Sequence, residues 1–218
     1  MNDTKKVTAV ILISGSGSTM ENLLQRAKDG TCAMECLGVI SSKEGVAGIA
    51  RAQKFGVPVQ VVNRKDFTDA VAFSRQVFKL INGVKPDLVL LAGFLSYVHL
   101  PERYKGRVMN IHPSLLPKFG GRGMYGSKVH ESVLKAGERE SGCTVHYVDD
   151  QYDHGPAIVQ KKVPVVAGDT VETLQARVMQ AEREAYPEAV NLYAEKRLMQ
   201  VANSVRILPV KAGAPTQA

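Results

Sequence analysis

Tryptophan is absent from the 218-residue sequence, and aromatic residues together make up only 6% of it. The three cysteines, at positions 32, 36 and 143, form no CxxC pair, which argues against a disulfide framework and against a cysteine-based metal site. No apolar run approaches the roughly 20 residues that a membrane-spanning helix needs. We therefore expect a cytoplasmic protein with reduced thiols, no bound metal and no membrane partner.

Positive charge is in excess, with a net charge of +7 and a pI near 9.3. The lysines and arginines are scattered, and no basic stripe interleaved with aromatic residues occurs. This pattern favours a small anionic ligand over a nucleic acid. The apolar run Val7–Ile13 leads into a glycine turn rather than a cleavage site, so we interpret it as a strand and not as a signal peptide.

Short apolar runs alternate with amphipathic helical patterns along most of the chain. This rhythm predicts an α/β fold, with a doubly wound, mostly parallel, Rossmann-like sheet in a single domain. We expect the domain over residues 1–200 and a partly disordered tail over 201–218. The predicted strands are 7–14, 36–41, 58–62, 88–92, 108–112, 143–148 and 158–165; the predicted helices are 19–28, 46–54, 66–81, 127–136 and 170–192, the last with a possible break near Pro187.

Gly15–Thr19 follows the first predicted strand and opens the first predicted helix. Backbone amides at such a turn, together with the helix N-terminus, bind anions. The third glycine of a dinucleotide fingerprint is missing, because Met20 or Glu21 stands there. No acidic residue ends the second strand, so we expect one phosphate and no nicotinamide cofactor. A tight turn without a ligand is the alternative.

Asn110 and His112 lie at the end of the fifth predicted strand, which Pro113 terminates. Side chains alternate along a strand, so these two share one face and Ile111 points to the other. An amide can donate to a developing oxyanion, and an imidazole can transfer a proton near neutral pH. The pair therefore predicts a catalytic site, although an Asn and a His can also simply satisfy a loop.

Two acidic residues are further candidates for the site, but the sequence around each of them is less specific. Asp153 lies 41 positions after His112 and would raise the pKa of an imidazole placed against it. A surface aspartate in a Gly-Pro turn is the alternative, and the spacing does not decide between them. Glu182, taken by itself, fits a solvated charge on the long last helix.

These segments together resemble the formyltransferase family that uses 10-formyltetrahydrofolate. The resemblance runs from about Val7 to about Arg197, and its central motif is highly specific. The segments that match the family are Leu12–Ser18, Leu91–Phe94, Asn110–Pro117, Gly142–His146 and Asp153–Pro156.

The resemblance implies a role for each matching residue. The family's catalytic residues fall on Asn110, His112 and Asp153. Its substrate phosphate segment falls on Gly17, Ser18 and Thr19, with Asn110 near the same substrate and Glu182 at the ribose. The surroundings of the folate pteridine fall on Leu95, Ser96, Tyr97, Val98, Asp149 and Asp153.

The resemblance also implies an activity. A formyl group would pass from 10-formyltetrahydrofolate, a cosubstrate, to the amine of glycinamide ribonucleotide (GAR) in purine synthesis, by direct attack through a tetrahedral intermediate. GAR and the formyl folate, the two partners, would both be small molecules, and no metal would be needed. The protein would be a monomer or a homodimer. Hydrolysis of the formyl folate by the same residues is the alternative, against which the phosphate turn argues. A non-catalytic nucleotide-binding or RNA-binding module is a third hypothesis, suggested only by the basic charge.

The sequence departs from the family pattern at four places. Thr19 stands where Asn is usual, and Leu95–Val98 stands where Met-Arg-Ile-Leu is common. A folate-contacting arginine of some members falls near Ala70, and the glycine loop 119–126 is longer than in several relatives. These departures concern contacts to the ligands rather than the chemistry.

Overall fold

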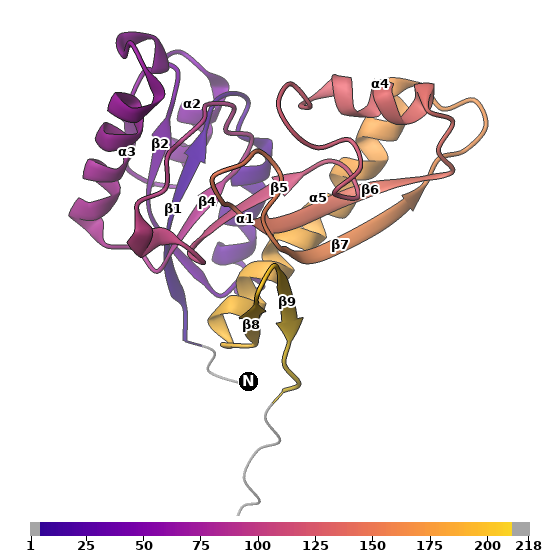
Figure 1. Cartoon of the computed structure of the whole chain (residues 1–218). Coiled ribbons are helices and arrows are strands. Elements are labelled where there is room, and N and C mark those ends of the chain that lie inside the picture. Colours follow the sequence, from indigo (N-terminus) through magenta and orange to yellow (C-terminus); the bar gives the residue numbers. More distant parts are fainter. Residues whose placement is uncertain (1–4, 211–218) are drawn as a thin grey trace, which may run out of the picture.

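A seven-stranded sheet forms the centre of the computed structural model, which describes residues 5–210 (Figure 1). The strand order β3-β2-β1-β4-β5-β6-β7 combines five parallel strands with an antiparallel pair, β6 and β7, at one edge. The strands are β1 (Val7–Ile13), β2 (Met34–Ser41), β3 (Val59–Val61), β4 (Leu88–Leu91), β5 (Val108–His112), β6 (Glu140–Tyr147) and β7 (Ala157–Pro164).

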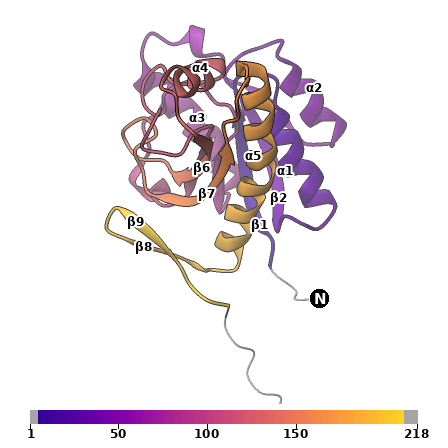
Figure 2. The same ribbon diagram turned by 90° about the vertical axis from the view of Figure 1, so that its right-hand side faces the viewer.

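Helices cover both faces of this sheet, as in a doubly wound fold. Figure 1 shows α3 on one face, and Figure 2 shows α1 and α5 running side by side on the other. The helices are α1 (Ser18–Lys28), α2 (Ala47–Lys54), α3 (Ala70–Val84), α4 (Ser127–Lys135) and α5 (Val171–Ala194), with short 3₁₀ helices at Arg64–Asp66 and Glu102–Tyr104.

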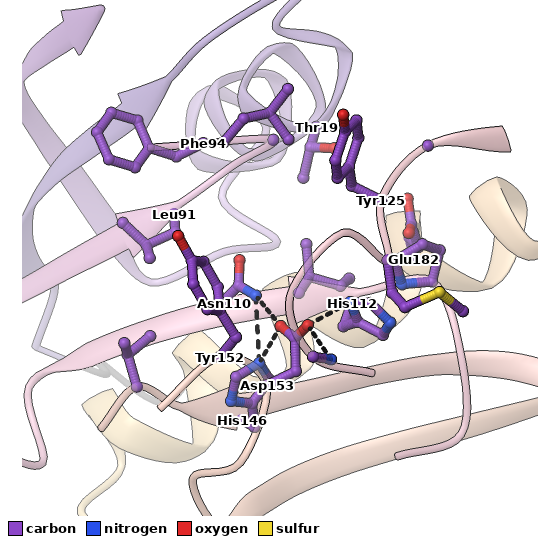
Figure 3. Close-up of a pocket in the computed structure, with 18 of the residues that line it drawn as sticks. Thr19, Leu91, Phe94, Asn110, His112, Tyr125, His146, Tyr152, Asp153 and Glu182 are labelled. Atoms are coloured by element: carbon purple, nitrogen blue, oxygen red, sulfur yellow. Dashed lines mark hydrogen bonds and ion pairs between the residues drawn. The ribbon is translucent and has the colours of Figure 1, made fainter. Parts of the chain in front are cut away.

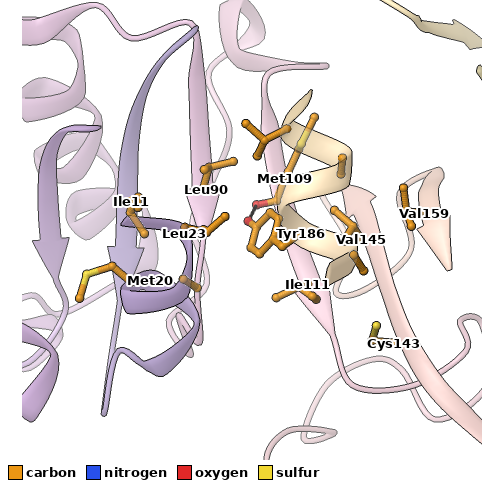
Figure 4. Close-up of a cluster of buried hydrophobic side chains, with 14 of the residues drawn as sticks. Ile11, Met20, Leu23, Leu90, Met109, Ile111, Cys143, Val145, Val159 and Tyr186 are labelled. Carbon is orange, nitrogen blue, oxygen red and sulfur yellow. Dashed lines mark hydrogen bonds between the residues drawn. The ribbon is translucent and has the colours of Figure 1, made fainter. Parts of the chain in front are cut away.

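Alternation along β1 divides the core into two layers. Ala9, Ile11 and Ile13 face the layer under α1 and α5, and Val10 and Leu12 face the layer under α3. Both sets are almost completely buried, which explains why β1 is a nearly continuous apolar run. Figure 4 shows the larger layer, with Tyr186 of α5 packed among strand side chains.

The predicted fold class is confirmed, and every predicted helix and strand occurs at nearly its expected place. The third helix begins at Ala70 rather than at residue 66, because Asp69 caps it through a 2.8 Å bond from the Ala72 amide. It also continues through Gly83 to Val84. Apolar spacing alone does not reveal a capping residue inside a polar stretch.

Pro187 does not break the last helix, contrary to the possible break considered above. A proline has no N–H for the carbonyl four residues earlier, which here belongs to Arg183. The side-chain amide of Asn22 in α1 donates to that carbonyl at 3.0 Å. The helix stays continuous from Val171 to Ala194 because a neighbouring helix satisfies the carbonyl that the proline leaves free.

Tyr186 links α5 to the two central strands that lead to the site. Its ring is fully buried, and its hydroxyl lies 2.9 Å from the carbonyl of Met109 and 3.1 Å from that of Leu91. We expect Tyr186→Phe to lower the free energy of unfolding by about 1–3 kcal/mol, because two buried carbonyls lose their shared donor. Urea denaturation measures this. Tyr193→Phe is the control, since the Tyr193 hydroxyl makes a single 3.3 Å bond, to the Asp87 carbonyl near solvent. Equal stability of Tyr186→Phe and wild type would contradict the prediction.

A hairpin of β8 (Leu198–Val201) and β9 (Ser204–Ile207) follows α5 and projects below the sheet (Figure 2). The predicted domain boundary at residue 200 therefore falls inside a strand. The remainder of the predicted tail, residues 211–218, lies outside the described residues. None of the helices in the described part of the chain is both long and apolar enough to span a membrane.

Candidate active site

A pocket of about 540 Å³ opens at the carboxyl ends of the central parallel strands. The strand order turns back between β1 and β4, and ligands of open α/β sheets bind at this kind of switch point. The pocket wall includes the start of α1, the segment after β4, the end of β5, the glycine loop and one side of α5. Segments far apart in the sequence thus meet around one cavity.

Asn110, His112 and Asp153 come together at the bottom of this pocket (Figure 3). Asn110 Nδ2 lies 3.4 Å from Asp153 Oδ1, and His112 Nδ1 lies 3.4 Å from Asp153 Oδ2. The side chain of Asp153 is 11% exposed, so it is not a surface aspartate. The sequence spacing of 41 residues did not decide whether Asp153 contacts His112, and the structure shows that it does.

The turn after β6 places Asp153 by close backbone packing. A Cβ on Gly155 would lie 1.9 Å from the carbonyl oxygen of Tyr147, so only glycine allows this approach. Asp153 itself has a positive φ of 52°, and its Oδ2 accepts a 3.0 Å bond from the Gly121 amide. Burial acts to raise the pKa of Asp153, but the neighbouring His146 and His112 rings and the Gly121 amide together hold it below the ordinary value.

His112 has an oxygen beside each ring nitrogen. Asp153 faces Nδ1, and the carbonyl of Phe119 lies 2.8 Å from Nε2. Burial lowers the pKa of His112, and the Asp153 carboxylate partly counters this by favouring the charged form. An imidazole in this setting is neutral in the free protein and has a counter-ion in place when it takes up a proton. For Nε2 to reach a ligand, the Phe119 carbonyl has to release it.

His146 completes the cluster and was not predicted from the sequence. It stands opposite Asn110 in the antiparallel pair of β5 and β6, and it is 2% exposed. Its Nδ1 lies 2.9 Å from the Tyr147 carbonyl, an acceptor, so Nδ1 carries the proton and Nε2 accepts at 3.2 Å from Asn110 Nδ2. The signal available in the sequence was the alternation of Thr144 and His146 in the predicted strand 143–148, whose other residues are apolar.

These contacts set the orientation of the Asn110 amide. Its Nδ2 is directed to His146 and Asp153, and its oxygen points away from both, as Figure 3 shows. Donation to an oxyanion in the pocket therefore requires one of the two N–H groups to leave its present acceptor. The bond to Asp153 is the longer one, at 3.4 Å, and is the weaker by geometry.

The predicted phosphate turn divides into two parts. Ser18 and Thr19 line the pocket, and α1 begins at Ser18 without a side-chain cap, so its first amides are free to bind an anion. Gly17 does not line it. With φ at 73°, Gly17 packs against α2, where an added Cβ would lie 2.7 Å from the Cα of Gly48. Bulk at Gly17 would therefore disturb the packing of the turn before it met a ligand.

Glu182 is not the solvated helix charge that its local sequence suggests. It lines the pocket from α5, and burial raises its pKa to about 7. No opposite charge contributes to this shift. A carboxylate held without an ionic partner in a pocket wall is typical of a ligand-binding position.

The segments expected around the folate line the opposite part of the pocket. Leu95, Ser96, Tyr97 and Val98 follow β4, and Asp149 and Asp153 follow β6. The Tyr97 hydroxyl donates to the Asp150 carbonyl at 2.8 Å, and the rings of Tyr97 and Tyr152 lie 5.2 Å apart. This side of the pocket therefore presents aromatic surface.

Within residues 5–210 no group of three or more His, Cys, Asp or Glu side chains is arranged to hold a metal ion. The pocket does contain one further histidine that sequence analysis missed. His130 of α4 lines the wall and is 2% exposed. It lies four residues beyond Gly126, the end of the glycine loop, and nothing in its local pattern separates it from the core positions of an amphipathic helix.

Comparison with known proteins gives the family. Residues 7–190 match the family model described as "Formyl transferase". The chain belongs to the formyl transferase family. The resemblance seen in the sequence is thereby confirmed.

Three relatives indicate its place within that family. Phosphoribosylglycinamide formyltransferase of Escherichia coli K12 is 36% identical over 197 residues, covering 89% of this chain and 91% of that protein. A glycinamide ribonucleotide transformylase 1 from Symbiobacterium toebii superposes with a TM-score of 0.88 at 36% identity, over 94% of this chain and 95% of that one. The "Trifunctional purine biosynthetic protein adenosine-3" of Gallus gallus is 40% identical over 193 residues, which are 88% of this chain; the chain spans only 19% of that protein's length.

A formyltetrahydrofolate deformylase from Pseudomonas syringae also superposes, with a TM-score of 0.83 over 94% of this chain and 67% of that one. Its identity is 24%, so it shares the fold alone.

Proposed function

We propose that this protein is a phosphoribosylglycinamide formyltransferase, which transfers the formyl group of 10-formyltetrahydrofolate to the amine of GAR in purine biosynthesis. The observation that carries the proposal is the pocket itself. One end offers the free amides of α1 beside Ser18 and Thr19, and the Asn110–His112–Asp153 cluster lies at the bottom. A phosphate and a reacting centre thus have separate places in one cavity.

The reaction needs a base, an oxyanion donor and a proton path. The amine attacks the formyl carbon, and negative charge develops on the formyl oxygen. Asn110 and the protonated form of His112 stabilise this charge, with Asp153 as the counter-ion of the imidazolium. When the carbon–nitrogen bond to the folate breaks, the proton lost by the amine is delivered to the folate nitrogen. The formyl carbon keeps its oxidation level, so the step balances without a redox partner.

The decisive assay follows the formyl donor with and without GAR. We expect rapid loss of 10-formyltetrahydrofolate only when GAR is present, with one formylated ribonucleotide formed per folate released. Loss at the same rate without GAR would identify the alternative, a deformylase, in which water takes the place of the amine. Loss of the donor under neither condition would contradict both enzymatic functions.

Glu182 gives the proposal a pH dependence. If its carboxylate accepts bonds from the ribose hydroxyls, binding of GAR requires the ionised form, and burial raises the pKa of Glu182 to about 7. Since the acid is protonated below that value, we expect the KM for GAR to be about tenfold higher at pH 6 than at pH 8.

The substrate's own phosphate and amine also titrate, so Glu182→Gln supplies the baseline. Its KM should be high throughout and should retain only the pH dependence of the substrate. An unchanged profile in Glu182→Gln would remove Glu182 from the ribose site.

The remaining roles follow from the same proposal. Gly17 holds the phosphate turn in shape, while Leu95–Val98 and Asp149 border the folate. We further propose a cytoplasmic enzyme with small-molecule partners only, acting as a monomer or homodimer. The proposed formyltransferase domain covers residues 1–200 and is followed by the segment 201–218, the first part of which pairs with it in the β8–β9 hairpin.

A further inference from the structure

His130 is a buried histidine without a hydrogen-bond partner in the wall of the active-site pocket. It belongs to the first turns of α4 and is 2% exposed. Its Nδ1 is fully enclosed and finds no partner within residues 5–210. An enclosed polar atom left unpaired is costly, so a turn of the ring that brings this nitrogen to a ligand group in the pocket is favourable.

The other two buried histidines of the pocket show the contrast. His112 has Asp153 and the Phe119 carbonyl beside its two nitrogens, and His146 has the Tyr147 carbonyl and Asn110. Both are committed to protein groups. His130 lines the same cavity with an uncommitted nitrogen.

The charge state of His130 limits what it can bind. Burial lowers its pKa, and the neighbouring His112 lowers it further. It also stands near the N-terminus of α4, where the helix dipole disfavours a positive charge. A neutral imidazole suits a neutral polar group, such as an amide or a hydroxyl, better than a phosphate.

The position of His130 selects the substrate. α4 packs against α5, which contributes Glu182 to the pocket, and His130 lines the same cavity as Glu182 and His112. In Figure 3 Glu182 lies on the same side of the pocket as His112, away from Tyr152 on the folate side.

We propose that the His130 ring turns when the amine substrate binds, and that Nδ1 then positions this substrate by a hydrogen bond to a neutral polar group between its reacting amine and its ribose. This inference rests on the proposed function, because it takes GAR as the ligand of that half of the pocket. The glycinamide linkage, with one carbonyl and one N–H, is the part of GAR that fits the description.

Steady-state kinetics of His130 variants test the proposal. We expect His130→Phe to raise the KM for GAR about tenfold while the KM for 10-formyltetrahydrofolate changes less than twofold. His130→Asn keeps an amide near the place of Nδ1 and should recover much of the loss. Glu131→Gln, at the exposed neighbour on the same helix, is the matched control and should behave as wild type. Equal effects on both KM values, or no rescue by Asn, would indicate a structural role and overturn the proposal.

A spectroscopic measurement on the unmodified protein covers the case of a variant that folds poorly. The ring nitrogens of His130, assigned by comparison with His130→Asn or with His130→Phe, should shift in ¹⁵N NMR when GAR is added and not when the folate is added alone. Absence of a shift with GAR would overturn the proposal. If wild type does not formylate GAR at all, the proposed function fails instead, and the two failures are distinguishable.

Discussion

Replacing His112 with alanine is expected to reduce kcat by about 10²–10⁴, the usual contribution of a positioned acid–base group. The imidazole ends β5 in the pocket and lies 3.4 Å from the Asp153 carboxylate. Without it, the proton lost by the attacking amine has no nearby carrier, and the oxyanion loses its cationic neighbour.

The fold should survive this change at some cost. His112 is 3% exposed, so its removal leaves the Phe119 carbonyl unpaired and costs about 1–3 kcal/mol of unfolding free energy. Single-turnover rates at saturating substrates separate this loss from the loss in catalysis. His99→Ala serves as the control, since that exposed histidine does not line the pocket. Wild-type turnover by His112→Ala would show that the site is wrongly assigned.

Replacing Asn110 with alanine is expected to reduce kcat by about 10²–10³, as removal of one oxyanion donor does elsewhere. The effect should appear in kcat more than in either KM, because the bond to the formyl oxygen strengthens only as charge develops. Rapid-quench measurement of formyl transfer gives the rate of the chemical step directly.

Asn82→Ala is the matched control for Asn110→Ala. Asn82 also uses its side chain internally, accepting a 2.8 Å bond from the Tyr104 hydroxyl, but it lies on α3, outside the pocket. We expect Asn82→Ala to lose stability without losing rate. An Asn110→Ala variant that raises only the KM for GAR would mean that Asn110 holds the substrate and does not stabilise the oxyanion.

The geometry of Asn110 makes this second prediction informative. In the free protein its two N–H groups are directed to His146 and Asp153, and its oxygen is turned away from them. A role as oxyanion donor therefore includes a rearrangement on ligand binding. His146, protonated on Nδ1 by its bond to the Tyr147 carbonyl, is the group that orients the amide until then.

Several features could be predicted from the sequence because they depend on local chemistry. Apolar alternation along Val7–Ile13 and its counterparts specifies buried parallel strands, and glycine followed by a helix specifies an anion-binding turn. The common face of Asn110 and His112 follows from a two-residue period. These properties need only a few neighbouring residues, so the sequence displays them directly.

Other features were decided by the tertiary structure alone. Glu182 became a pocket residue with a raised pKa because α5 packs its charged turn against the cavity, and the continuity of that helix through Pro187 depends on Asn22 from another helix. Asp153 reached His112 because Gly155 lets the turn pack against β6. His146 and His130 entered the site through an antiparallel strand pair and a helix whose positions no local pattern encodes. Burial and contact between distant segments are properties of the packed chain. The sequence by itself therefore determined the helices, the strands and the common face of Asn110 and His112. The folded arrangement determined which charges are buried and what they touch.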